Sequence, residues 1–515
     1  MSDPFYITTA IHYPNGRPHI GHAYEMIAAD AIARFQRQAG RDVFFQTGTD
    51  EHGLKMVKTA RERGVEVRAL ADEMSGYFRE MSGALNISCD RFIRTVEPQH
   101  YAASQAIWTA MRDAGDLYLD RYEGWYSVRD EAFYEEKELV DGEGGARLSP
   151  QGTPVEWTAE ETWFFRLSKY QQPLLDFYAA NPDFIQPESR RNEVLRFVEG
   201  GLTDLSVSRT SFDWGVPVPG SPGHVMYVWV DALTNYLTGT GYPDAPNRYW
   251  PAALHLIGKD IVRFHAVYWP AFLMSAALPL PQKVFGHGFL LNRGEKMSKS
   301  TGNVVDPMQL ATLYGVDTLR YFLLRDISFG QDGTFSDDAI VTRANSDLAN
   351  SFGNLAQRTL SFIAKNLGGE LPAMGRGDPA DAALVSAVGE AIDGLRRGFM
   401  DLHLSQGLEA WMRGVFACNQ YIDVQAPWAL RKTDPDRMHA VLGTLVRVIR
   451  DLAVAIYPVV PASAEALLAQ LGQAGAGHDV LGDDGWYAAA QAGGFRIAPP
   501  TPIFPRLTIE ESVPV

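Results

Sequence analysis

The chain has 515 residues, of which 46% are hydrophobic and 21% are charged, as in an ordinary globular protein. At about 150 residues per domain, this length predicts roughly three compact units. The net charge of −16 excludes a generic basic nucleic-acid coat, so any bound nucleic acid must meet a local basic patch. The two cysteines, Cys89 and Cys418, exclude a disulfide framework and a four-cysteine zinc site, and they favour a reducing, cytoplasmic compartment.

Neither a signal peptide nor a membrane span is expected. Residues 1–10 contain no basic residue and no long apolar core. Residues 266–281 carry no charge, but they contain three prolines and are shorter than the about 18 to 20 apolar residues that a span requires. We expect a buried helix there that ends before a proline-rich loop, and no contact with a membrane.

The N-terminal segment alternates strand, turn, helix and strand. Residues 5–11 are apolar or β-prone at nearly every position, as in a strand buried on both faces, and residues 14–16 turn the chain. Residues 23–37 have a helical pattern, residues 43–47 form a second strand, and another helical stretch follows from Leu54. This order predicts a parallel sheet with a nucleotide-type crevice at its strand ends.

The middle of the chain changes character and is predicted to be an insertion. Residues 116–223 are rich in aromatic and acidic residues, and the α/β pattern resumes at residues 226–230, 254–258 and 283–288. From about residue 337 to residue 471 no strand pattern is obvious, and apolar residues recur at helical spacing, which is typical of a helical bundle. The prediction is one α/β domain in two halves, residues 1–115 and 226–336, interrupted by an insertion at 116–225. A helical domain at 337–497 and a proline-rich C-terminal strap at 498–515 follow.

Two short motifs carry candidate chemistry. In Pro18–His22 two imidazoles lie three residues apart at a helix start, where free N–H groups and the positive dipole end favour phosphate, and Gly21 permits close approach of a nucleotide. In Gly294–Asn303 glycines flank two lysines and small hydroxyls, as in a loop that closes positive charge over a polyphosphate. A lone pair of surface histidines or a solvated turn is the alternative for each motif by itself. Both motifs in this order, each after a strand-like segment, favour the chemical interpretation.

These motifs carry a resemblance to a known family. His19–His22 and Lys296–Ser300 resemble the two motifs of class I aminoacyl-tRNA synthetases. The resemblance narrows to the methionyl-tRNA synthetase family over four longer segments, residues 10–16, 47–53, 227–232 and 257–265. It covers about residues 5–470. It implies a class I Rossmann-like parallel-sheet catalytic domain with an inserted connective domain, followed by an α-helical bundle domain that binds the anticodon.

The resemblance also implies site residues. The catalytic set is His19, His22, Lys296 and Lys299. The ATP-binding set adds Gly21, Gly258, Lys259, Asp260 and His287, with Asp260 expected on the ribose. The methionine-binding set is Ala10, Ile11, Tyr13, Asp50, Trp229, Ala232, Leu233, Tyr236, Ile261 and His265. Asp50 is expected to hold the ammonium group and the aromatic rings to surround the thioether, although plain core packing is the alternative for each ring.

The helical part is expected to read tRNA. Asn354 and Arg358 lie four residues apart on one helix face, and Trp428 offers a stacking surface for an unstacked base. A buried aromatic at a helix end after Pro427 is the alternative for Trp428. Many relatives carry a Cys-x-x-Cys zinc knuckle in the insertion, whereas the corresponding residues 122–130 here contain no cysteine. We therefore expect no metal site and no zinc, with an insertion held by aromatic packing.

The implied reaction joins L-methionine to tRNA(Met), initiator and elongator, through methionyl-adenylate. Its substrate is ATP with Mg²⁺, whose ligands are mainly phosphate and water. A monomer is expected because no tRNA-binding OB-fold module follows the helical domain. The alternatives are a synthetase for isoleucine, valine or leucine, a nucleotidyltransferase for another small acid, and a non-catalytic tRNA-binding relative. The small insertion, the anticodon residues and the retained histidines and lysines argue against each in turn.

Overall fold

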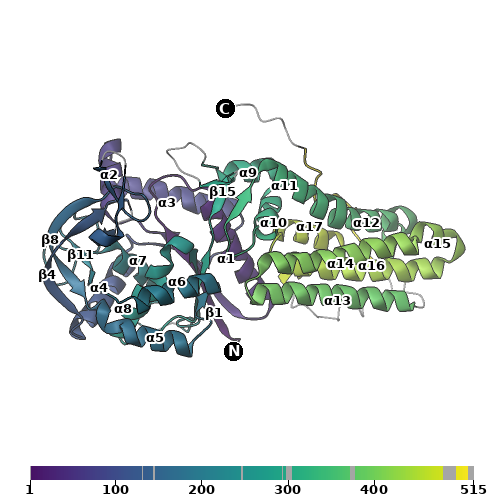
Figure 1. Cartoon of the computed structure of the whole chain (residues 1–515). Helices are drawn as coiled ribbons and strands as arrows, with labels where there is room; N and C mark the ends of the chain where they lie inside the picture. The colour runs from purple at the N-terminus through teal and green to yellow at the C-terminus, as the bar shows by residue number, and fades with distance from the viewer. Residues whose placement is uncertain are drawn as a thin grey trace.

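A computed structural model describes residues 2–129, 132–142, 145–244, 248–292, 294–296, 304–371, 377–478 and 495–508. Figure 1 shows an α/β half joined to an elongated half made of helices, with helix α1 (Ile20–Gln38) between them. This arrangement confirms the predicted fold class, a parallel-sheet α/β domain followed by a helical bundle.

A six-stranded parallel sheet forms the centre of the α/β half, in the order β3-β2-β1-β13-β14-β9. Nearly every residue of β1 is buried, because helices cover both faces of a parallel sheet. The strands are β1 Pro4–His12, β2 Asp42–Thr49, β3 Arg91–Arg94, β9 Ile185–Gln186, β13 Ala253–Gly258 and β14 Lys283–His287. The helices of this half, besides α1, are α2 Leu54–Arg63, α3 Val67–Ala84, α4 Pro98–Asp113, α7 Val228–Thr238, α8 Trp269–Ser275, α9 Pro307–Tyr314 and α10 Val316–Asp326.

The insertion forms an antiparallel sheet in the order β10-β8-β4-β5, at the left end of Figure 1. Its long strands β4 (Leu117–Ser127) and β8 (Glu156–Phe165) are joined by ring contacts, with centroids 5.4 Å apart for Trp125 and Trp157. The other elements of the insertion are β5 Ala132–Tyr134, β6 Val140–Asp141, β7 Arg147–Leu148, α5 Gln171–Ala180, α6 Glu188–Glu199, β10 Leu205–Ser206, β11 Ser208–Arg209 and β12 Val225–Met226. Strand β9, which also comes from the insertion, pairs with β14 at the edge of the main sheet. The sequence pattern did not predict this exchange.

Two segments differ in detail from the sequence pattern. Residues 226–230 leave the short pair β11–β12 and start helix α7 at Val228, so they add no strand to the main sheet. The uncharged run at 266–281 begins within a π-helical turn, Phe264–Tyr268, and continues as the buried helix α8. This helix ends at Ser275, before a loop, as expected. A further small sheet contains β15 (Leu290–Asn292), β16 (Glu295–Lys296) and β17 (Gly333–Phe335).

The second half is helical, and its longest helices α13, α14 and α16 run side by side in Figure 1. The apolar series predicted for α16 is buried, including Val441, Leu445, Val448 and Leu452. One short strand pair, β18 (Glu370–Leu371) with β19 (Phe495–Arg496), was not predicted. Within the part of the chain that the structure describes, no helix has both the length and the apolar character to cross a bilayer. The helices are α11 Asp337–Arg343, α12 Asn354–Leu367, α13 Pro379–Met400, α14 Leu404–Gln425, α15 Pro427–Thr433, α16 Pro435–Ile456 and α17 Pro461–Gln470, with a π-helical turn at Ala344–Gly353.

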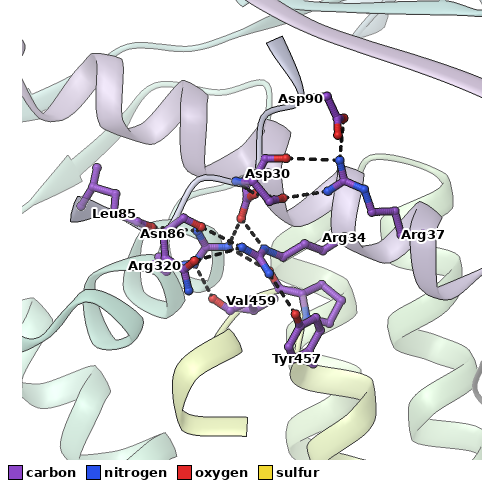
Figure 2. Close-up of polar contacts among 11 residues, drawn as sticks. Asp30, Arg34, Arg37, Leu85, Asn86, Asp90, Arg320, Tyr457 and Val459 are labelled. Atoms are coloured by element: carbon purple, nitrogen blue, oxygen red, sulfur yellow. Dashed lines mark hydrogen bonds and ion pairs between the residues drawn. The ribbon is translucent and has the colours of Figure 1, made fainter. Parts of the chain in front are cut away.

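A buried charge cluster, which we call the junction cluster, joins the two halves (Figure 2). The Asp30 carboxylate on α1 accepts hydrogen bonds from Arg34 at 2.8 Å and from Arg320 on α10 at 2.6 Å. Ser88 donates two further bonds to it, from its backbone N–H and its hydroxyl. Arg320 also donates to the carbonyl oxygen of Val459, and Arg34 donates to the hydroxyl of Tyr457. The helix that begins at the histidine motif is thereby fixed to the loop that ends α16.

Candidate active site and anticodon-binding surface

His19 and His22 lie together at the start of α1, as the sequence predicts. His19 is the N-cap residue, and its Nδ1 accepts a hydrogen bond from the Gly21 backbone N–H at 3.1 Å. The backbone N–H of His19 donates to His22 Nδ1 at 3.1 Å, and the two rings stack with centroids 3.8 Å apart. Because each Nδ1 is an acceptor, each neutral ring carries its proton on Nε2. The two rings thus combine N–H donors with the positive end of the helix dipole, which favours a phosphate.

Gly21 is required at this helix start for a local steric reason. A Cβ atom at this position would lie 2.9 Å from Cε1 of His19. Any side chain would therefore displace the His19 ring from its capping position. The structure shows a close approach of Gly21 to the His19 ring, and the approach of a nucleotide to Gly21 stays a prediction.

The segment that contains the predicted lysine loop meets the histidine motif at one end. Before the loop, Lys296 ends β16, which pairs with β15. After the loop, the carbonyl oxygen of Val305 accepts a hydrogen bond from the backbone N–H of Ile20 at 3.1 Å. The side chain of Lys296 and the whole of Lys299 lie outside the described residues, so their contact with phosphate stays a prediction.

Gly258 and His287 are paired neighbours at the carboxyl ends of β13 and β14. A Cβ at Gly258 would lie 2.7 Å from Oδ1 of Asp260, so the glycine makes room for that carboxylate. Lys259, predicted to bind ATP, forms an ion pair with Asp332, with Nζ 2.7 Å from Oδ2. Three of the residues predicted to bind ATP, Gly258, Asp260 and His287, thus lie at the carboxyl ends of β13 and β14. Lys259 lies beside them in its ion pair with Asp332.

Sequence reasoning missed Glu25, a buried acid on α1. Its carboxylate accepts hydrogen bonds from the backbone N–H of Ala10 at 3.0 Å and from Nε2 of His287 at 2.8 Å. Nδ1 of His287 donates to the carbonyl oxygen of Gly288 at 2.8 Å, so both ring nitrogens face acceptors. Burial opposes protonation of this ring, but the bond and the attraction from Glu25 prevail and raise the pKa of His287. The available signal was an acid beside Met26 and Ile27, in the apolar stretch of α1 that precedes Asp30.

His12, at the end of β1, was also missed. Its buried ring lies between the ring of His22, with centroids 4.9 Å apart, and that of Phe78, with centroids 5.4 Å apart. Burial lowers the pKa of His12, which favours a neutral ring. His12 is therefore an uncharged packing partner of the His22 ring.

Several of the residues predicted to bind methionine lie on or against helix α7. The Tyr236 hydroxyl donates to Nε2 of His265 at 2.7 Å, and Nδ1 of His265 donates to the carbonyl oxygen of Ile261 at 3.0 Å. Burial lowers the pKa of His265 to about 4, so this ring is neutral at pH 7. The Trp229 ring stacks on that of Phe264 with centroids 3.8 Å apart. Ala232 and Leu233 are buried on the same helix.

The remaining residues predicted to bind methionine lie in or just after the carboxyl ends of strands β1 and β2. Ala10 and Ile11 belong to β1, and Asp50 comes directly after β2, with its backbone N–H bonded to the carbonyl oxygen of His12 at 2.9 Å. The hydroxyl of Tyr13 accepts a hydrogen bond from the backbone N–H of Met56 at 3.1 Å. These residues share the edge of the sheet at which ligands bind in open α/β folds.

The predicted anticodon residues lie on the surface of the helical half, far from α1 in Figure 1. Trp428 on α15 is 46% exposed, so the alternative of a buried helix-end aromatic is wrong. The guanidinium of Arg358 lies 5.4 Å from the Trp428 ring centroid and 2.7 Å from Oδ1 of Asp423. Arg358 and Trp428 line one cavity of about 250 Å³. Asn354 lines a second cavity of about 320 Å³, which is also lined by Phe504 of the C-terminal strap.

The residues that the structure describes contain no group of three or more His, Cys, Asp or Glu side chains arranged to hold a metal ion. In the insertion, side chains on and near residues 122–129 make ring and polar contacts. Nε1 of Trp125 donates to the carboxylate of Glu136, and Arg147 forms ion pairs with Glu136 and Asp141.

Comparisons with known proteins agree with this geometry over both halves. A family model described as tRNA synthetases class I (M) matches residues 5–360. A second, described as the anticodon binding domain of methionyl tRNA ligase, matches residues 371–513. The sheet with a histidine-capped helix at its carboxyl edge is therefore that of a class I aminoacyl-tRNA synthetase, as expected.

Curated relatives match at nearly full length. Methionine--tRNA ligase of Brucella suis biovar 1 is 56% identical over 510 residues, which covers 98% of each chain. Methionine--tRNA ligase of Mycobacterium tuberculosis (strain ATCC 25618 / H37Rv) is 56% identical over 514 residues, again covering 98% of each chain. Mycobacterium tuberculosis methionyl-tRNA synthetase in complex with methionyl-adenylate superposes with a TM-score of 0.93 at 55% identity, covering 98% of this chain and 100% of the other. The chain belongs to the methionyl-tRNA synthetase family.

Proposed function

We propose that this chain ligates L-methionine to tRNA(Met) in two steps, through a methionyl-adenylate intermediate. The observation that carries the proposal is the full-length likeness to methionine--tRNA ligases, which spans the catalytic and helical halves alike. The site supports it, because a histidine-capped helix, a strand-end carboxylate and a group of aromatic rings around α7 lie at the carboxyl ends of the parallel strands. These features suit a nucleotide, an ammonium group and a thioether respectively.

In the first step the carboxylate of methionine attacks the α-phosphorus of ATP in line, and pyrophosphate leaves. Such chemistry depends on positioning and on stabilisation of developing charge. His19 and His22 donate N–H groups to the phosphates from Nε2, while Lys296 and Lys299 supply positive charge from the loop. Mg²⁺ enters with ATP and is held mainly by phosphate and water. Gly258, Asp260 and His287 border the adenosine.

Methionine binds with its ammonium group on Asp50 and its side chain among the rings of α7. The sulfur lies near the pair formed by Tyr236 and His265, whose hydroxyl and imidazole groups fix each other by a 2.7 Å bond. Since His265 is neutral, the pocket presents no charge to the thioether. Trp229, Leu233 and Ala232 enclose the apolar part of the side chain.

In the second step the methionyl group passes to the 2′-hydroxyl of the terminal adenosine of tRNA, and AMP leaves. Asn354, Arg358 and Trp428 read the anticodon of both initiator and elongator tRNA at the far end of the molecule. The enzyme acts as a monomer in the cytoplasm and carries no zinc. Two free cysteines, one of them buried, are compatible with a reducing compartment.

The function is tested by ATP–pyrophosphate exchange. The assay is run with each of the twenty amino acids in turn, with and without tRNA. We expect exchange with methionine alone and without a requirement for tRNA, followed by charging of tRNA(Met). Exchange with isoleucine, valine or leucine at a higher kcat/KM would assign another synthetase. Tight tRNA binding without any exchange would assign a non-catalytic relative.

Replacing Trp428 with Ala is expected to leave pyrophosphate exchange unchanged and to lower kcat/KM for tRNA about tenfold or more. Stacking of a base on an aromatic ring contributes about 1–3 kcal/mol, and the exposed ring lies on the helical half, where it lines a cavity with Arg358 and Phe362. Phe416 on α14 is 55% exposed and provides a matched control, for which F416A should change neither assay. Equal losses in exchange and charging by W428A would place Trp428 in the fold.

A further inference from the structure

A fully buried carboxylate, Asp231, lies in the first turn of α7 and has no part in the mechanism above. Its Oδ2 accepts a hydrogen bond from Nδ1 of His52 at 2.6 Å. Its Oδ1 accepts one from Nε2 of His100 at 2.6 Å. One carboxylate thus joins three segments: α7, α4, and the loop that follows β2.

The two histidines are themselves fixed by second bonds. Nε2 of His52 lies 2.9 Å from the hydroxyl of Tyr101 on α4. Nδ1 of His100 lies 2.9 Å from the hydroxyl of Thr238, in the last turn of α7. Neither imidazole can rotate without breaking two hydrogen bonds, so the cluster is stiff. We call these five residues the Asp231 cluster.

The charge of Asp231 strengthens these bonds. Burial by itself would raise the pKa of the carboxyl group, but the attraction and hydrogen bonds from His52 and His100 lower it to about 2. Asp231 is therefore ionised at pH 7. Hydrogen bonds to an ionised acceptor are shorter and about twice as strong as those between neutral groups.

The loop joined by His52 is the one that carries Asp50, and it is anchored at each neighbouring residue. The backbone N–H of Glu51 donates to Oγ1 of Thr95 at 2.8 Å, and its carboxylate forms an ion pair with Arg94 at 2.6 Å. The backbone N–H of Gly53 donates to the carbonyl oxygen of Trp214 at 3.2 Å. Only Glu51 separates His52 from Asp50, and its backbone has little freedom, so a displacement of His52 would move Asp50.

The helix joined by Asp231 is the one that carries the predicted contacts of the methionine side chain. Ala232 follows Asp231 directly, and on the same helix α7 Trp229 lies two residues before Asp231 and Tyr236 five residues after it. The cluster therefore joins the two ends of the methionine pocket, where the ammonium group and the thioether bind. The separation of these ends decides whether both ends of a substrate are satisfied together.

From this geometry we infer that Asp231 is a positioning residue for methionine: through His52 and His100 it sets the separation between the Asp50 carboxylate and the side chains of α7 that enclose the thioether. The inference rests on the proposed function, because it assumes that Asp50 and α7 bind methionine. Asp231 does not touch the substrate and acts through its histidine partners.

The test is Asp231→Asn in the full-length enzyme, assayed by pyrophosphate exchange. The amide keeps the volume of the carboxylate but presents an N–H₂ group to one imidazole donor and removes the charge. We expect the KM for methionine to rise about tenfold or more, while the KM for ATP and the kcat change less than about threefold. An unchanged KM for methionine, or equal rises in both KM values, would overturn the inference.

Two further variants separate positioning from a loss of folding. His52→Asn keeps a donor near the position of Nδ1, whereas His52→Ala removes it, so H52N should restore most of the methionine affinity lost in H52A. Asp116→Asn is a matched control, since Asp116 is also buried but accepts from Lys169, Tyr170 and Ser275 instead. D116N should lower the melting temperature without changing the KM for methionine. Failure of H52N to restore affinity, or an equal KM rise in D116N, would contradict positioning.

Asp50→Asn separates the inference from the proposed function. If D50N and D231N both raise the KM for methionine, the site and its positioning residue both stand. If D50N raises it and D231N does not, the inference fails and the proposed site stands. If D50N leaves it unchanged, the proposed ammonium site fails, and the inference falls with it.

Discussion

Replacement of His19 by Asn is expected to lower the rate of methionyl-adenylate formation about a hundredfold and to leave the melting temperature almost unchanged. The side-chain oxygen of Asn takes over the N-cap role of Nδ1, which accepts from the Gly21 N–H at 3.1 Å. With its oxygen in that role, the amide N–H₂ group of Asn does not reach the position of Nε2, from which His19 donates to the phosphates in the proposed mechanism. Removing one donor that stabilises developing charge typically costs about 3–4 kcal/mol. Pre-steady-state adenylate formation measures the loss.

His19→Ala is the comparison that separates capping from chemistry. Ala loses both the cap and the N–H donor, so H19A should be as slow as H19N and less stable by about 1 kcal/mol. Lys299→Ala, on the loop that follows β16, should show a rate loss of similar size, since the lysine is proposed to act on the same phosphates. An H19N variant with the wild-type rate would remove His19 from the mechanism.

Asp30→Asn is expected to destabilise the protein by about 3–5 kcal/mol, the largest effect on stability that we predict. In the junction cluster, Asp30 balances the guanidinium groups of Arg34 and Arg320, and loss of its charge removes the carboxylate that is hydrogen-bonded to both of these groups (Figure 2). The urea midpoint of unfolding measures the change. Asp90→Asn is a matched control from the same view, because the Asp90 carboxylate is 40% exposed and its ion pair with Arg37 should contribute at most about 1 kcal/mol.

The same cluster predicts how the D30N effect depends on pH. Burial would raise the pKa of Asp30, but Arg320, Arg34 and the two bonds from Ser88 outweigh burial and lower it. A carboxyl group with a lowered folded-state pKa stabilises the protein fully above its unfolded pKa of about 3.9, and this contribution is lost as the pH falls through the folded value. The stability gap between wild type and D30N should therefore be constant near neutrality and narrow below about pH 4. A gap that does not narrow in acid would show that Asp30 is not the titrating group.

Local patterns in the sequence predicted the elements that depend on local physics. The apolar run at 5–11 became the buried strand β1, and the apolar spacing near Val441 became the core face of α16. The position of the histidine pair at a helix start was also predicted, because the signal lies within a few neighbouring residues. The family resemblance then supplied the class of fold and reaction, which the comparisons confirm.

Long-range polar pairs left no such pattern. Asp231 bonds His52 and His100, and Asp30 bonds Arg320, across separations of more than a hundred residues. Asp231 and Asp30 are charged residues at buried helix positions with apolar neighbours, which periodicity treats as exceptions and not as signals. Glu25 was missed for the same reason. The residues that touch methionine, ATP and the anticodon remain predictions, to be tested by the variants above.

Strand β9 has a consequence for anyone who exchanges modules within this enzyme. Ile185 and Gln186 come from the insertion, yet they pair with Val284 and Phe285 at the edge of the main sheet. A shortened chain that deletes residues 116–225 would leave the N–H and C=O groups of β14 exposed as a template for association with other chains. Chimeras with another insertion should therefore retain residues 184–187 or supply an equivalent strand, or they will be lost to aggregation before any assay.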